Sequence, residues 1–327
     1  MVRFGVIGTN WITDRFIDGA QKIKDFQLTA VYSRTEENAK EFANKYGVTS
    51  TYTDLSVFAE SDVIDAVYIA SPTAFHAEHA MTCMKAGKHV IVEKPFASNQ
   101  REVESMIETA KANNVTLMEA MKTTHLPNFD LVKKSLDKIG PVRRYVANFC
   151  QYSSRYDKYK EGIVLNAFKP ELSNGSLMDI GVYCLYPMVA LFGAPERVKA
   201  TGYMLDSGVD GEGTVTVDYP TLNGVAMFSK ITNSKLPSEI QGEKGSIVIG
   251  KFSDMRDVKI VYHDGTEEKL TTDQVENSMY YEALSFIQSV QKGEIENSTN
   301  TWELSLETMK VLDQAREDIG LVFPADK

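Results

Sequence analysis

The sequence predicts an α/β protein of two domains: the first is built on a doubly wound parallel sheet, and the second is an α+β domain with a largely antiparallel, open sheet. Strand-like and helix-like segments alternate up to about residue 122, which is typical of βαβ units. Beyond that point strand-like runs follow one another. A length of 327 residues also suits two domains. We therefore expect one domain over residues 1–122 and another over residues 123–327.

Short apolar runs predict the strands of the first domain, at residues 4–7, 27–32, 66–70, 89–92 and 115–118. The run at 66–70 is apolar throughout, as expected for a parallel sheet that is covered on both faces. Between the strands, apolar residues recur at helical spacing. One such helix carries Ala39, Phe42 and Ala43 on one face and ends at Gly47.

Strand-like runs of the second domain lie at residues 142–152, 198–205, 214–219, 225–231, 247–249 and 258–262. The dipeptides Asn223-Gly224 and Asp264-Gly265 predict hairpin turns, because these residue types tolerate positive φ. Helices are expected at about 280–291 and 301–319, where apolar residues return to helical spacing.

The composition excludes several classes of protein. The net charge of −10 opposes binding to nucleic acid and to acidic membrane surfaces. The apolar stretch around 182–192 is too short and too interrupted to span a bilayer, and no leader is apparent, so a cytoplasmic protein is expected. Cys83, Cys150 and Cys184 form no metal-ligand pattern and are expected to be buried, reduced thiols.

The turn after the first strand is the expected site of a dinucleotide pyrophosphate. It contains Gly8, Thr9, Asn10, Trp11 and Ile12, and of the usual glycines only Gly8 is in place. A glycine there lets the backbone turn tightly, so that N–H groups at the start of a helix meet the phosphates. Asn10 tolerates a left-handed conformation and is expected to replace a missing glycine in that way.

Ser33 and Arg34 follow the second predicted strand, where enzymes that use NAD usually carry an acidic residue. A carboxylate would repel the 2′-phosphate of NADP, whereas a guanidinium pairs with it. We therefore favour NADP over NAD as the cofactor, although Arg34 would also be an ordinary residue at the exposed start of a helix.

Three further motifs make the pattern recognisable. They are Ala70-Ser71-Pro72-Thr73 with His76, then Glu93-Lys94-Pro95, then the segment from Gly175 to Tyr183, which reads GSLMDIGVY. In order and spacing they resemble the signature regions of the Gfo/Idh/MocA oxidoreductase family over essentially the whole chain. Tyr183, where many members have histidine, resembles the branch of dimeric dihydrodiol dehydrogenase, D-xylose dehydrogenase and glucose-fructose oxidoreductase. The chain departs from the family in its glycine-poor first turn and in Asn174-Gly175, where more glycines are usual.

The resemblance implies roles for particular residues. It makes Lys94 the catalytic acid or base, at the carboxyl end of a parallel strand where this architecture binds ligands. From the residues alone, Lys94 would equally be a surface lysine. Asp179 and Tyr183 are four residues apart and would share a helical face, with Tyr183 as a proton donor or relay and Asp179 as a substrate anchor. The residues expected to contact the cofactor from these motifs are Ser71, Pro72, Thr73, His76, Glu93 and Lys94 itself.

Three weaker candidates for contact with the substrate are His125, Asn166 and Phe168, which lie just after the boundary or just before the Asp179 motif. No cluster of carboxylates or cysteines accompanies the histidines, so no metal site is expected.

We therefore expect an NADP-dependent oxidoreductase that transfers a hydride between the nicotinamide and a sugar, polyol or dihydrodiol. The open sheet of the second domain suggests a homodimer or a higher oligomer. Two alternatives remain, an NAD-dependent inositol-type dehydrogenase and a non-catalytic sensor that binds NADP. Tyr183 and Arg34 argue against the first, and the joint presence of Lys94, Asp179 and Tyr183 argues against the second.

Overall fold

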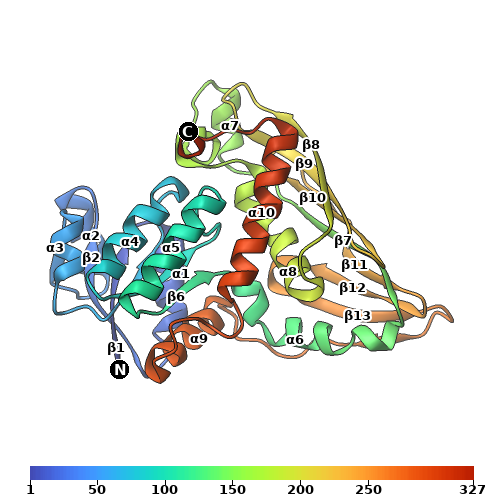
Figure 1. Cartoon of the computed structure of the whole chain (residues 1–327), viewed down its shortest axis with the longest axis horizontal. Helices are drawn as coiled ribbons and strands as arrows, with labels where there is room; N and C mark the ends of the chain where they lie inside the picture. Colours follow the sequence, from blue (N-terminus) through green and yellow to red (C-terminus); the bar gives the residue numbers. More distant parts are fainter. The chain divides into compact units, whose positions relative to one another are not determined.

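The computed structural model describes all 327 residues. The chain forms two compact units, one from residues 1–122 and 275–305 and the other from residues 123–274 and 306–327 (Figure 1). The first unit is therefore discontinuous in sequence. The expected division into residues 1–122 and 123–327 assigned residues 275–305 to the second domain, whereas in the structure they belong to the first unit.

The first unit contains a six-stranded sheet in the order β3-β2-β1-β4-β5-β6, and all its neighbouring strands are parallel. The strands are β1 (Val2–Ile7), β2 (Phe26–Tyr32), β3 (Ser50–Tyr52), β4 (Ala66–Ile69), β5 (His89–Glu93) and β6 (Leu117–Ala120). This order confirms the predicted doubly wound sheet. The strand order reverses between β1 and β4, and in such sheets ligands bind beyond the carboxyl ends of the strands at that point.

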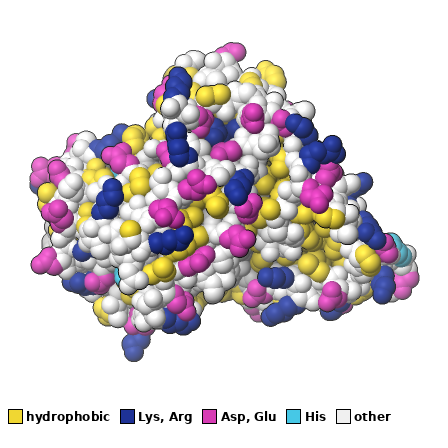
Figure 2. Space-filling view, in the orientation of Figure 1, with side chains coloured by type: hydrophobic (Ala, Val, Ile, Leu, Met, Phe, Trp, Pro, Cys, Tyr) yellow, Lys and Arg dark blue, Asp and Glu magenta, His cyan; other side chains and the backbone are white.

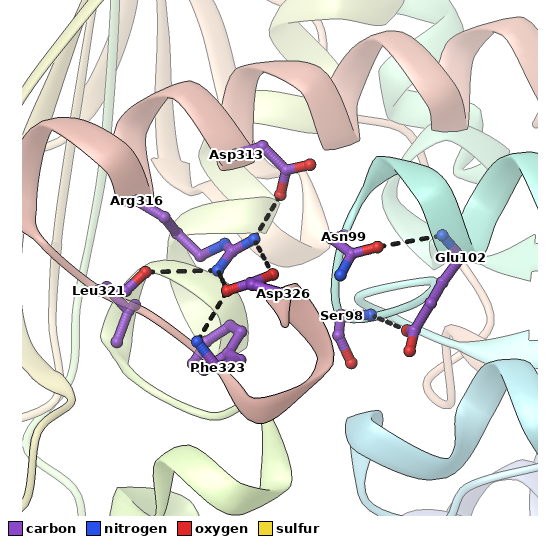
Figure 3. Close-up of polar contacts among 8 residues, drawn as sticks. All are labelled: Ser98, Asn99, Glu102, Asp313, Arg316, Leu321, Phe323 and Asp326. Atoms are coloured by element: carbon purple, nitrogen blue, oxygen red, sulfur yellow. Dashed lines mark hydrogen bonds and ion pairs between the residues drawn. The ribbon is translucent and has the colours of Figure 1, made fainter.

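The helices of the first unit are α1 (Trp11–Ala20), α2 (Glu36–Lys45), α3 (Leu55–Glu60), α4 (His76–Lys85), α5 (Gln100–Asn113) and α9 (Met279–Lys292). Several begin at a polar side chain that accepts a backbone N–H, which satisfies donors that the helix itself leaves without partners. At α5, Asn99 Oδ1 accepts from the Glu102 backbone over 3.0 Å, while a Glu102 oxygen accepts from the Ser98 N–H over 2.8 Å (Figure 3).

Aromatic side chains make much of the core of the first unit. Phe16 of α1 stacks on Tyr68 of β4, with ring centroids 3.8 Å apart, and Phe4 contacts Phe26 and Phe286. Each such buried ring contributes roughly 1.5–3 kcal/mol by leaving water. Phe286 belongs to α9, so residues from near the end of the chain complete this core.

The second unit contains an eight-stranded sheet in the order β14-β13-β12-β11-β7-β10-β9-β8. Only β7 and β10 pair in parallel, so the predicted, largely antiparallel sheet is confirmed. The strands are β7 (Val142–Cys150), β8 (Arg197–Met204), β9 (Asp210–Asp218), β10 (Asn223–Ser229), β11 (Ser238–Gly242), β12 (Gly245–Lys251), β13 (Arg256–Tyr262) and β14 (Glu267–Lys269). Its helices are α6 (Pro127–Lys134), α7 (Tyr156–Lys160) and α8 (Val182–Phe192), together with most of α10 (Trp302–Ile319).

One of the two predicted hairpin turns is wrong. Asn223 and Gly224 lie inside β10, and the turn before it is closed by Tyr219, whose N–H donates to the Leu222 carbonyl. Gly224 is needed for packing, because a Cβ there would lie 2.6 Å from a methyl carbon of Val217. The other predicted turn is present: Gly265 has φ +84° between β13 and β14.

The helical segment Pro170–Phe192 has 23 residues and by length and composition alone could cross a membrane, although α8 itself has only 11 residues. The segment is long because helical turns, including a π turn over Leu177–Gly181, precede α8. However, 67% of its apolar window is buried inside the protein, and α8 packs on β7 and β10. Such burial is typical of a helix in the core of a protein.

Charged side chains of both signs are interspersed over the face seen in Figure 2. That face carries no continuous basic stripe of the kind that binds nucleic acid. All three cysteines are free; Cys83 and Cys184 are buried as expected, whereas Cys150 is only half-buried.

Candidate functional site

Gly8 brings the turn after β1 against the end of β4. Its φ is +102°, and a Cβ there would lie 2.5 Å from the Ala70 carbonyl oxygen. The Thr13 hydroxyl donates to the Gly8 carbonyl over 2.9 Å and ties the turn to α1. The tight turn expected of Gly8 is therefore present, and it lies at the switch point of the sheet.

Asn10 does not replace a glycine in the way we expected. Its φ is −110°, which is extended and not left-handed. Its side chain instead caps α1, since Oδ1 accepts from the N–H groups of Ile12 and Thr13, while Nδ2 donates to the Ala70 carbonyl over 2.8 Å. Asparagine is well suited to this position, because its side-chain oxygen can cap a helix while its side-chain nitrogen donates a hydrogen bond elsewhere. Asn10 thus holds the start of α1 beside the end of β4.

The end of β2 carries the candidate residues for the cofactor's adenosine end. Ser33 is nearly buried and Arg34 is exposed. Nearby, the His79 ring stacks on Phe75 with centroids 5.9 Å apart, and its Nδ1 lies 3.0 Å from the Ser71 hydroxyl. Burial, and to a smaller extent the charge of Arg34, lowers the pKa of His79 to about 4. An exposed guanidinium can both lie against an adenine and pair with a phosphate.

His76 joins two of the motifs from inside the protein. Only 1% of it is exposed, and its ring nitrogens lie 2.8 Å from the Ser71 carbonyl and 3.0 Å from the Pro95 carbonyl. Burial lowers its pKa to about 4, and a neutral imidazole has one N–H to donate. Both nitrogens face protein atoms, so His76 positions the turns after β4 and β5. It was expected to approach the cofactor directly.

Lys94 directly follows β5, and the peptide bond between it and Pro95 is cis. The preceding Glu93 is buried and accepts a 2.6 Å hydrogen bond from the Tyr68 hydroxyl. Burial raises the pKa of Glu93, and the positive charges of Lys94 and Lys122 act against that rise. The structure therefore places Lys94 at the carboxyl end of β5. The side chain of the preceding residue, Glu93, is buried inside the unit.

Two further buried carboxyl groups lie close enough to Glu93 to interact with it, and sequence reasoning missed both. Burial raises the pKa of Glu119 on β6 to about 8. Burial also raises the pKa of Glu282 on α9 well above its usual value, and neither of its oxygens has a hydrogen-bond partner. The only signal in the sequence is an acidic residue at an otherwise apolar position, such as Glu119 after Leu117 and Met118.

Asp179 and Tyr183 lie in the second unit, in the middle of the helical segment Pro170–Phe192. Asp179 is in the π turn and Tyr183 in the first turn of α8. Both are partly exposed, whereas most of their neighbours in the segment are buried, so they share its more open side. The Tyr183 ring meets Phe149 of β7 edge-on at 5.6 Å. An Asp179 oxygen pairs with Lys230 over 2.6 Å.

Asp210, which the sequence analysis did not select, holds the beginning of this helical segment. It is fully buried, and one of its oxygens accepts from the Leu177 N–H over 2.7 Å. Burial raises its pKa to about 6. Gly175 has φ +147°, and a Cβ there would lie 2.1 Å from an Asp210 oxygen. The glycine in this motif is therefore required by the backbone conformation and by Asp210.

The three weaker substrate candidates differ in position. Asn166 is exposed, and its carbonyl accepts from the Asn174 side chain. Phe168 is fully buried beneath the amine of Lys230 and contacts Tyr159, so it supports the site from inside. Burial lowers the pKa of His125 to about 4, and its Nε2 is buried without a hydrogen-bond partner.

Comparisons with known proteins identify the family of the chain. The model of the oxidoreductase family with an NAD-binding Rossmann fold matches residues 2–121, and that of the GFO/IDH/MocA C-terminal domain matches residues 131–248. The chain is 57% identical to the scyllo-inositol 2-dehydrogenase (NADP(+)) IolU of Bacillus subtilis over 100% of both chains. It is 46% identical to the oxidoreductase YgjR of Escherichia coli, over 100% of this chain and 99% of the relative.

A more distant relative is the trans-1,2-dihydrobenzene-1,2-diol dehydrogenase of Mus musculus, at 29% identity over 100% of this chain and 99% of the relative. Among solved structures, the fold resembles a 3-ketoreductase from Actinomadura kijaniata in complex with NADP and TDP-benzene. That comparison has a TM-score of 0.85 and 24% identity, and it covers 97% of this chain and 98% of the other. The expected dehydrogenase class is confirmed, and the chain belongs to the Gfo/Idh/MocA family of oxidoreductases.

Proposed function

We propose that this protein oxidises a secondary ring hydroxyl of a cyclic polyol of the inositol type, with NADP⁺ as the oxidant. The observation that carries the proposal is the position of Lys94 at the carboxyl end of β5, one strand from the switch point of the sheet. The name of the Bacillus subtilis relative supports this substrate class, because the identity of 57% extends over the whole chain.

NADP is the cofactor, as in that relative and in the 3-ketoreductase complex. The first unit fits it, because no Cβ would fit at Gly8 and the start of α1 lies beside the turn. Arg34 and Ser33 would bind the 2′-phosphate. The remaining expected contacts come from Thr9, Trp11 and Ile12, from Ser71, Pro72 and Thr73, and from Glu93. When bound, the nicotinamide ring accepts the hydride from the substrate or returns it.

Lys94 is the proposed acid and base. In the oxidation, the Nζ of Lys94 accepts the hydroxyl proton while the ring carbon loses a hydride, and a carbonyl group forms. In the reduction, the same ammonium returns a proton to the carbonyl oxygen. A lysine performs the first step only when it is neutral, and a nearby positive charge favours that form.

Asp179 and Tyr183 are the proposed contacts for the substrate from the second unit. The carboxylate of Asp179 would accept a hydrogen bond from a neighbouring ring hydroxyl, and the hydroxyl of Tyr183 would donate to the reacting oxygen or relay its proton. A polyol has several adjacent hydroxyl groups, so a pair of such side chains suits it.

The test is nicotinamide absorbance during incubation with NADP⁺ or NAD⁺ and a panel of scyllo-inositol, myo-inositol, D-xylose, D-glucose and trans-dihydrobenzenediol. We expect turnover with an inositol and NADP⁺. Lys94→Met is expected to lose about 10²–10⁴-fold of this turnover, because general acid–base catalysis contributes that much. NADPH binding, followed by fluorescence, should persist.

The matched control for Lys94→Met is Lys85→Met, which removes an exposed lysine at the end of α4 in the same unit. It should keep wild-type turnover. Full turnover in Lys94→Met would contradict the mechanism. Tight NADPH binding without turnover of any panel member would instead favour the sensor function.

Self-association and location are also proposals. The eight-stranded sheet of the second unit is proposed to support a homodimer or a higher oligomer, which light scattering of the NADP-bound protein would detect. The protein is proposed to act in the cytoplasm on a small carbohydrate-like molecule.

A further inference from the structure

Lys230 is a buried lysine that belongs to none of the sequence motifs. It directly follows β10, and only 3% of it is exposed. Its Nζ lies 2.6 Å from Asp179 Oδ2 and 3.3 Å from the Ala167 carbonyl oxygen, and 5.2 Å from the centre of the Phe168 ring. Moving an ammonium group out of water is costly unless it is paired, so these partners account for its charge in the interior.

The partners of Lys230 place it beside the π turn. Asp179 lies within the turn, and Asp210 accepts from the N–H of Leu177, its first residue. The charge of Lys230 also reaches Asp210, where it opposes the rise in pKa that burial causes. One buried cation therefore interacts with Asp179, inside the π turn, and with Asp210, which holds the first residue of that turn.

The pair is asymmetric in its exposure. The side chain of Asp179 is 36% exposed, whereas that of Lys230 is 4% exposed. One oxygen of Asp179 is thus anchored from the interior while the carboxylate still reaches solvent. A π turn is a rare geometry that is often found at functional sites, and here it gives Asp179 this position.

We infer that Lys230 is a positioning residue that fixes the carboxylate of Asp179 in place for a hydroxyl group of the polyol. This inference rests on the proposed function. Lys230 touches no substrate in this scheme and acts only through Asp179. Without the cation, the carboxylate would lose the 2.6 Å contact that holds one of its oxygens from the interior.

The test is a double-mutant cycle with Lys230→Met, Asp179→Asn and the double variant, using scyllo-inositol and saturating NADP⁺. We expect Lys230→Met to raise the KM for the polyol about 10–100-fold, the range for a lost charge-assisted contact, and to change kcat less. In the Asp179→Asn background, Lys230→Met should change KM by less than about twofold, because the residue through which it acts is already altered.

Lys199→Met is the matched control, since Lys199 pairs with Asp318 at the surface of the same unit. It should leave KM unchanged. If Lys230→Met fails to fold, as judged by thermal unfolding, the double variant decides, because removing both charges of a buried pair is tolerated better than removing one. A KM of the double variant like that of Asp179→Asn supports the inference.

Two results would overturn the inference. One is an unchanged KM in folded Lys230→Met. The other is additive effects in the cycle, that is, a KM for the double variant far above that of Asp179→Asn. A wild-type protein without activity on any polyol would contradict the proposed function and this inference together. A wild-type protein that turns over scyllo-inositol, with Lys230→Met showing the same KM, would contradict the inference alone.

Discussion

At the scale of single residues, two glycines show how backbone geometry serves the site. Gly8 and Gly175 both have positive φ, and at both positions a Cβ would collide with an oxygen atom. At Gly8 that atom is the Ala70 carbonyl, and at Gly175 it is a carboxylate oxygen of Asp210. Each glycine thus permits a close approach that positions a candidate functional segment.

Gly8→Ala should weaken both folding and cofactor binding. The added methyl group would lie 2.5 Å from a backbone oxygen that cannot move easily, at φ +102°. We expect a loss of about 2–4 kcal/mol in the free energy of unfolding, together with at least tenfold weaker NADPH binding. Urea unfolding and a fluorescence titration would measure the two effects.

Gly87→Ala is the control for that substitution. Gly87 has φ +77° but no atom within 4 Å of the position of a Cβ, so only the conformational strain applies. Its expected loss is about 1 kcal/mol, with unchanged NADPH binding. Equal effects of the two substitutions on binding would argue against a special role for the turn at Gly8.

The sequence offers candidate site residues where they stand in motifs, but it does not reveal isolated charged residues that the fold buries. Gly8, Ser71, Lys94, Asp179 and Tyr183 stand in motifs whose order could be read directly. Lys230, Asp210, Glu119 and Glu282 could not be found in this way, because a buried charged residue and an exposed one look alike in a sequence. Their burial depends on neighbours that are distant along the chain, such as Asp179 for Lys230.

At the scale of helices and strands, periodicity predicted the long elements and missed the short ones. The helices α2, α4, α5 and α9 have one apolar face, which sequence spacing reveals. The strands β3 and β14 have three residues each and lie at sheet edges, where little apolar surface is buried. The missed β11 is largely polar even though it lies inside its sheet.

The end of α10 shows how an element is fixed by a buried cation. The Arg316 guanidinium donates to Asp313 and Asp326, each over 2.7 Å, and to the Leu321 carbonyl, and it lies 4.6 Å from the ring of Phe323 (Figure 3). Only 6% of its side chain is exposed. These contacts hold the last residues of the chain against the helix.

Arg316→Met should therefore destabilise the second unit by about 2–4 kcal/mol, less than for a fully buried pair because both carboxylates are partly exposed. Thermal unfolding would measure the change. Arg197→Met removes an exposed ion pair with Asp218 and should cost less than about 1 kcal/mol. Similar losses in both variants would mean that the buried network adds little.

At the scale of the whole molecule, the buried carboxyl groups make stability depend on pH. Burial raises the pKa of Glu119 from its usual 4.5 to about 8. The carboxyl group of Glu119 therefore ionises at a lower pH in the unfolded chain than in the folded protein. The contribution of Glu119 to stability is largest below about pH 4.5 and is lost as the pH rises toward about 8.

Glu119→Gln should reduce this dependence, since glutamine stays neutral. Between about pH 5 and about pH 8 we expect the variant to lose less stability than the wild type, by an amount on the order of a few kcal/mol. Thermal unfolding at several pH values is the measurement, with the exposed Glu78→Gln as control. Identical profiles for wild type and Glu119→Gln would show that Glu119 is ionised in the folded protein.

The return of residues 275–305 to the first unit affects the order in which the protein can fold during synthesis. The nucleotide-binding sheet is made first, but Phe286, which packs against Phe4, is made near the end. The nascent first unit must therefore leave the ribosome with part of its core uncovered, while the whole sheet of the second unit is translated. The first unit of the enzyme begins synthesis first, but its hydrophobic core can be completed only after residues 275–305 have been made.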